Sequence, residues 1–188
     1  MKKIVFAGLM LLASMSVFAQ KWTVDGNVNF NLFSWNAGDI EDETTSFLLT
    51  LRAGRYVTDR LNIGIRGSFG IEDDGYSFSA GPSVRYDFYE IDKVYFSVTG
   101  GVFYTRFIES YPWNDYFTGN DANRIHAIIA PSVAYKVNSN VEVFWQFASI
   151  EYRYIWLTLK ETEFDCTVSD FRIQGPLANP AFGIRFRF

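Results

Sequence analysis

The chain contains one histidine, His126, which is the obvious candidate for a catalytic general base. A hydrolase site built on one strand face would place a nucleophilic serine two residues from that histidine. The residue in this position is Ile128, and the nearest serine on the face of His126 is Ser132, about 20 Å further along an extended strand. We therefore expect no enzymatic activity and interpret His126 as a member of an interior polar network.

The rest of the sequence offers little other chemistry. It contains no metal-ligand spacing, phosphate-binding loop or paired-carboxylate motif, so we expect neither a metal nor a cofactor. The single cysteine, Cys166, excludes an internal disulfide and is interpreted as a solvent-near loop residue. Without Lys2 and Lys3, which belong to an export signal, 15 basic residues remain against 21 acidic ones. This acidic balance disfavours a nucleic-acid partner.

Arginine recurs at the polar positions of segments that alternate between apolar and polar residues. The interior polar network that we expect consists of Arg52, Arg66, Arg85, Arg124, His126 and Glu142. Lys136, Arg185 and Arg187 occupy equivalent positions, and the possible carboxylate partners are Asp25, Asp87, Glu142 and Glu151. Because charges removed from water are normally paired, this pattern predicts a polar core filled by ion pairs.

The elements that would position these residues are eight alternating segments. The first six are Trp22 to Trp35, Thr45 to Tyr56, Arg60 to Ile71, Tyr76 to Phe88, Lys93 to Phe107 and Ala122 to Lys136. The seventh begins at Val141 and the eighth ends at Phe188, and the pattern between Tyr152 and Pro180 defines no boundaries. Strands can cross hydrocarbon only as a closed barrel. We therefore predict an all-β protein, an eight-stranded antiparallel up-and-down transmembrane β-barrel.

The first residues indicate where in the cell this barrel is located. Lys2 and Lys3 are followed by an apolar run from Ile4 to Leu12 and by a cleavage motif that ends at Ala19. This is the pattern of a secretory signal peptide. We expect residues 1–19 to be removed and residues 20–188 to form one barrel domain in the outer membrane of a Gram-negative bacterium.

The connections between the segments differ in length. Short turns follow the second, fourth and sixth segments and should face the periplasm, whereas the longer polar connections should face outward. The three expected outer loops are Asn36 to Thr44, Ile108 to Asp121 and Leu157 to Ser169. The candidate contacts with an external surface lie in the second of these loops and are Tyr111, Trp113, Tyr116 and Phe117. The alternative is that these aromatic residues form the upper interfacial girdle.

A soluble lipocalin-type barrel is the competing interpretation, because periodicity does not say which face points inward. Aromatic residues favour the membrane, since they gather at both ends of the segments as interfacial girdles do. Trp22, Tyr56 and Tyr135 are assigned to the periplasmic girdle. Pro82 and Pro131 cannot donate to a backbone ladder, so we expect local bulges there.

The sequence resembles the small eight-stranded outer-membrane barrels similar to OmpX and to the transmembrane domain of OmpA. The resemblance covers residues 20–188 and is carried by the signal peptide, by GPSVRYDF (Gly81 to Phe88) and by FGIRFRF (Phe182 to Phe188). It implies that the terminal strand is read by the barrel assembly machinery. In this chain that signal maps to Phe182, Ile184, Phe186 and Phe188.

Two functions follow from this interpretation. The first is a monomeric, structural or surface-interaction protein of the cell envelope, whose partners are outer-membrane lipid and, through the outer loops, an extracellular ligand or an adhesion surface. The alternative is a narrow pore for ions or small solutes. Eight strands leave an interior that side chains can just fill, so the interior arginines decide between the two.

Overall fold

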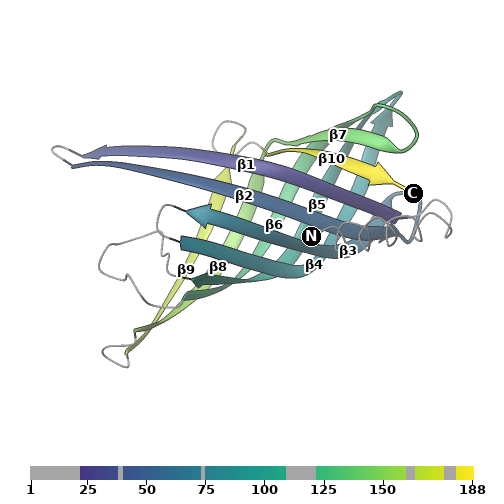
Figure 1. The fold of residues 1–188 in the computed structure, drawn as a ribbon. Helices are drawn as coiled ribbons and strands as arrows, with labels where there is room; N and C mark the ends of the chain where they lie inside the picture. Colours follow the sequence, from purple (N-terminus) through teal and green to yellow (C-terminus); the bar gives the residue numbers. More distant parts are fainter. Residues whose placement is uncertain (1–21, 38–39, 73–74, 109–121, 160–163, 176–180) are drawn as a thin grey trace, which may run out of the picture.

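The computed structural model describes residues 22–37, 40–72, 75–108, 122–159, 164–175 and 181–188, and these form one antiparallel β-barrel (Figure 1). The strands are β1 (Trp22–Ala37), β2 (Ile40–Tyr56), β3 (Leu61–Glu72), β4 (Gly75–Ile91), β5 (Val94–Ile108), β6 (Ala122–Lys136), β7 (Val141–Gln146), β8 (Ser149–Leu159), β9 (Phe164–Gln174) and β10 (Ala181–Arg187). No helix among these residues is long and apolar enough to cross a membrane.

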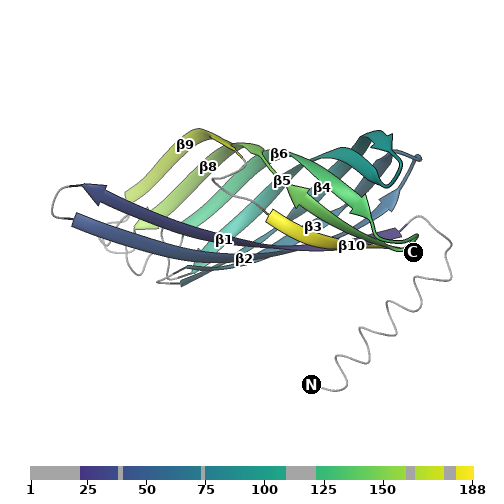
Figure 2. The ribbon, with the colours of Figure 1, turned by 90° about the horizontal axis from the view of Figure 1, so that it is seen from above.

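Ten strands make eight spans, because the last two spans are each divided. β7 and β8 both pair with β6, and β9 and β10 follow them as the two halves of the final span. Following the expectation from the turn lengths, the end that carries Trp22 and Phe188 is called periplasmic and the opposite end outer. The barrel closes through β10, which pairs with β1 from Thr23↔Arg187 to Val28↔Phe182 (Figure 2). The eight-stranded closed barrel expected from the sequence is therefore confirmed.

The strand faces settle which side of the barrel is apolar. The largest outward exposures include Ile65 (69%), Ile173 (73%) and Phe182 (62%), whereas Arg85 and Arg185 on the opposite face are 0% and 1% exposed. A soluble ligand-binding barrel would show the reverse arrangement. The apolar exterior and polar interior are those of a transmembrane barrel.

Short turns join the strands at the end that carries Trp22 and Phe188. In the turn at 57–60, the Thr58 hydroxyl accepts the Leu61 N–H at 3.0 Å. In the turn at 137–140, the Asn138 side chain accepts the N–H groups of Asn140 and Val141 at 2.8 and 2.9 Å. These side-chain caps fix where β3 and β7 begin, and thus the register of the polar face.

Two of the expected outer loops are wrong, because the structure extends strands through them. Residues 36–37 of β1 pair with residues 40–41 of β2, so Asn36 to Thr44 is mainly the tip of a long hairpin, visible in Figure 1 beyond the other strands. β8 and β9 likewise take up most of Leu157 to Ser169, and Cys166 lies on β9 opposite Leu157 rather than in a loop. An outer tip above the membrane needs no apolar alternation, which is why the sequence pattern missed these extensions.

The local bulge expected at Pro131 is confirmed, whereas none occurs at Pro82. Pro82 pairs with Ile65, and the β4–β5 register is the same on both sides of it. Opposite Pro131 the register shifts by one residue, from Ser132↔Gln146 to Ile129↔Ile150, so the facing span carries one extra residue at 147–149. The Phe147 N–H donates to the Pro131 carbonyl there at 3.3 Å. Because Pro131 has no N–H to return, the ladder is interrupted there and β7 and β8 separate. The bulge expected near Asn179–Pro180 lies outside the described residues.

Candidate functional site: the lumen

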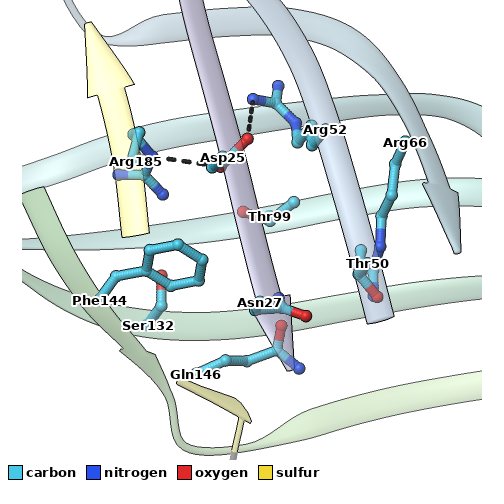
Figure 3. A pocket seen from close by; sticks show the side chains of 10 residues that line it. All are labelled: Asp25, Asn27, Thr50, Arg52, Arg66, Thr99, Ser132, Phe144, Gln146 and Arg185. Carbon is cyan, nitrogen blue, oxygen red and sulfur yellow. Dashed lines mark hydrogen bonds and ion pairs between the residues drawn. The ribbon is translucent and has the colours of Figure 1, made fainter. Parts of the chain in front are cut away.

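Asp25 of β1 is the centre of an ion-pair cluster in the periplasmic half of the lumen. Its carboxylate accepts from Arg85 Nη1 and from Arg185 Nε, both at 3.2 Å, and it lies 3.8 Å from Arg52 Nη1. Figure 3 shows Asp25 between the side chains of Arg52 and Arg185. One carboxylate thus joins guanidinium groups from three other strands, β2, β4 and β10.

Glu142 of β7 is the second carboxylate of the cluster. It accepts from Arg185 Nη1 at 3.1 Å and from the Tyr95 hydroxyl, and it forms an ion pair with Arg187 Nε. Arg185 also donates to the Tyr95 hydroxyl at 2.5 Å. Arg185 therefore bridges Asp25 to Glu142 across the closing strand of the barrel.

Asp87 of β4 is the third carboxylate. The Tyr56 hydroxyl donates to it at 2.5 Å, and Arg85 Nε lies 3.3 Å away. Tyr56 is only 8% exposed, so its assignment to the periplasmic girdle is wrong. Along β2 the residues alternate strictly, and Tyr56 shares the inward face of Arg52 and Gly54, a parity that its position at the strand end concealed.

These contacts form one continuous unit that we call the plug. Its members are Asp25, Arg52, Tyr56, Arg85, Asp87, Tyr95, Glu142, Arg185 and Arg187. Asn62 extends it by accepting from Arg52 Nη2 at 2.6 Å and donating to the Thr23 hydroxyl at 3.2 Å. Charged groups from opposite walls therefore meet in the middle of the lumen and occupy it.

Aromatic rings complete the packing beside the plug. The Arg185 guanidinium lies 4.9 Å from the centroid of the Phe144 ring, a favourable cation–π distance. This ring lies against Gly183, where an added Cβ would be 2.4 Å from it. The same Cβ would lie 2.4 Å from the backbone oxygen of Gly26, which cannot turn aside as a ring can, so a glycine is required at that position.

Two cavities lie on the outer side of the plug. The first, shown in Figure 3, has a volume of about 30 Å³ and is bordered by Asp25, Arg52 and Arg185 at one end and by Arg66 at the other. The second, which we call the outer cavity, measures about 250 Å³. Arg66 lines both cavities, so its side chain lies between the plug and the outer half of the lumen.

The outer cavity holds the remaining interior residues that the sequence singled out. Arg66 and Arg124 line it together with Arg153 and Arg172, and His126 contacts Glu151 through Nδ1. His126 Nε2 lies 3.4 Å from the Thr105 hydroxyl, which is a long contact. Lys136 is placed elsewhere, at the periplasmic rim, where it pairs with Glu90.

Sequence reasoning missed Tyr56 and Tyr95, which supply hydroxyl groups to the plug. The available signal was parity, because both share the polar face of their strands.

The proposed assembly residues Phe182, Ile184 and Phe186 lie on the outward face of β10, with exposures of 62, 48 and 44%. Phe188 exchanges backbone hydrogen bonds with Trp22 at 3.0 and 3.3 Å. The loop candidates Tyr111, Trp113, Tyr116 and Phe117, and the signal peptide, lie outside the described residues.

Solved structures of other proteins share this architecture. No protein-family model matches the chain, and no curated protein matches it. Among solved structures it is similar to Neisserial surface protein A (NspA), with 16% identity, coverage of 89% of this chain and 97% of that one, and a TM-score of 0.56. It is also similar to the N-terminal β-barrel domain of Pseudomonas aeruginosa OprF, with 15% identity, coverage of 90 and 98%, and a TM-score of 0.54. The chain therefore has the fold of the small eight-stranded bacterial outer-membrane β-barrels.

Proposed function

We propose that this protein is a non-conducting barrel of the outer membrane that acts as a rigid scaffold for surface interaction. The plug is the observation that carries the proposal. Arg85, Arg185 and Glu142 are each at most 1% exposed, and their contacts tie strands on opposite walls together. A conduction path would have to break several charge-assisted hydrogen bonds at once, which opposes the narrow-pore alternative.

The outer end of the barrel supports the interaction role. A tilted strand needs about 9–11 residues to cross a membrane. β1 has 16 residues and β2 has 17, so their hairpin continues well past the span, as Figure 1 shows. Such an extension is a stiff projection on a closed scaffold, which is where binding surfaces of barrels and sandwiches commonly occur.

Single-channel recording of the refolded mature protein in a planar bilayer tests the absence of conduction. We expect no discrete openings from the wild type or from Arg66→Ala, because the plug lies on the periplasmic side of Arg66 and does not include it. Discrete openings whose amplitude changes in Arg66→Ala would establish the pore instead and would contradict the scaffold.

Deletion of residues 110–119 tests the interaction role. β5 and β6 pair from Val94↔Tyr135 to Phe107↔Ala122 without these residues, so the barrel should still fold. Adhesion of cells that display the protein to a host-cell or matrix surface should fall, while the surface level of the protein stays unchanged. Equal adhesion by the deletion variant and the wild type would show that residues 110–119 take no part in surface interaction.

A further inference from the structure

The outer cavity carries an excess of positive charge. Four arginines, Arg66, Arg124, Arg153 and Arg172, line it against one lining carboxylate, Glu151. Asp170 adds a second carboxylate by pairing with Arg153 and Arg172, with Arg172 Nε at 3.2 Å. Among the described residues that line or pair with this cavity, two formal positive charges remain when both carboxylates are counted and His126 is neutral. The cavity is therefore electrostatically suited to an anion.

Arg66 is the residue whose charge is left without an ionic partner. It forms no hydrogen bond or ion pair with any residue that the structure describes, and its guanidinium instead lies 5.2 Å from the centroid of the Phe103 ring. Asp25 and Glu151 act on it electrostatically. Both are already bound, Asp25 by Arg85 and Arg185 and Glu151 by His126.

The register explains this isolation. Arg52 and Arg66 are direct neighbours across β2 and β3, and both point into the lumen. Like charges in such a pair repel each other, so their side chains diverge. Arg52 lies beside Asp25, Asn62 and Ser83. Figure 3 shows Arg66 apart from Arg52 and Asp25 and near Thr50.

A guanidinium removed from bulk water is costly to leave without a counter-charge. Its planar array of N–H donors matches the oxygens of phosphate and carboxylate groups. We propose that the outer cavity binds a phosphate-type oxyanion, with Arg66 as its principal contact and with Arg124 and Arg172 contributing positive charge from other walls. A volume of about 250 Å³ holds such an ion together with water.

Phosphate can reach the cavity from solvent or as the headgroup of a lipid. β9 pairs with β8, and the outer half of β1 pairs with β2, but no backbone pairing joins β9 to β1 among the described residues. Both β1 and β9 contribute side chains to the outer cavity. The outer cavity therefore reaches the part of the wall where no β1–β9 pairing is seen among the described residues, and a lipid headgroup is the second source of phosphate to test.

The test is calorimetric titration of the refolded mature protein in dodecyl maltoside micelles, which carry no phosphate. The two probes are inorganic phosphate, at fixed ionic strength, and dioctanoyl phosphatidylglycerol. We expect saturable binding that Arg66→Gln weakens at least about tenfold, as loss of a charge-assisted contact should. Arg66→Lys should bind with intermediate affinity, because it keeps the charge without the planar donor array.

Arg60→Gln is the matched control, because it removes the same charge from the exposed turn at 57–60. It should bind both probes as the wild type does. If the phospholipid competes with inorganic phosphate at lower concentration, the ligand is a lipid headgroup; if it does not compete, the ligand is the free ion. No saturable binding of either probe would overturn the proposal. So would an affinity that changes by less than about twofold in folded Arg66→Gln, or in Arg66→Lys if the glutamine variant does not fold.

Discussion

Substitution of Asp25 by asparagine should destabilise the barrel strongly. Asn keeps the shape of the side chain but removes the charge that Arg85 and Arg185 each contact at 3.2 Å. The Asp25 side chain is 7% exposed, and those of Arg85 and Arg185 are 0 and 2% exposed, so solvent cannot replace the lost contacts. Breaking a buried ion pair by removing one partner costs about 3–5 kcal/mol. We expect a loss of that size in the free energy of unfolding.

Urea unfolding of the protein refolded in lipid vesicles, followed by tryptophan fluorescence and by heat-dependent gel mobility, measures this loss. Asp59→Asn in the exposed turn at 57–60 is the matched control and should change stability by less than about 0.5 kcal/mol. A double-mutant cycle with Arg185→Gln should give a coupling energy above about 1 kcal/mol, because the two side chains are in contact. An Asp25→Asn variant as stable as the control would refute the inference that the plug stabilises the barrel.

Three further predictions concern the barrel wall. Gly183→Ala should lower the free energy of unfolding by about 1–3 kcal/mol, because the added Cβ would overlap the Phe144 ring. Gly67→Ala is the control: its Cβ would meet only one atom, at 3.6 Å, so this variant should be as stable as the wild type in the same urea assay. Ile65→Lys, at a mid-span position with a side chain 69% exposed on the outer face, should lower the free energy of unfolding by about 2–4 kcal/mol. Ile91→Lys, at the periplasmic rim, should lower it by only about 0–1 kcal/mol. Equal losses for the two variants would contradict the assignment of Ile65 to the lipid-facing surface. Phe188→Ala keeps its backbone bonds, so refolded stability should hold while the level of assembled protein in cells falls; an unchanged level would remove the assembly role.

Most of the correct predictions, the strand bounds and the inward-facing side chains, follow from the two-residue period of the strands. It placed Arg52, Arg66 and Arg85 inside the lumen and fixed β6 at Ala122–Lys136, because a shift by one residue would have turned every side chain to the opposite face. It did not say which arginine would meet which carboxylate. Those contacts depend on the stagger of the closed barrel, which brings Asp25 of β1 opposite Arg185 of β10.

The errors have local causes. The place of Tyr56 at a strand end indicates a girdle residue, although the parity of β2 puts it inside. The sequence of the β1–β2 tip indicates a loop because a polar hairpin above the membrane lacks the apolar alternation of a span. The break between β7 and β8 follows from a proline in the neighbouring strand, and neighbours across the sheet are not adjacent in the sequence.

The position of Arg185 also bears on how the barrel folds. Its partner Asp25 is 160 residues away along the chain, and the two meet directly across the β1–β10 pairing. A contact of such high sequence separation forms late, because a long loop must first be closed. Until β10 reaches β1, Asp25 lacks one of its guanidinium partners, Arg185, so an open sheet lacks the stabilisation of the complete plug. The plug thereby makes closure cooperative. A sheet in which β10 has not yet paired with β1 should unfold again rather than persist as a stable intermediate.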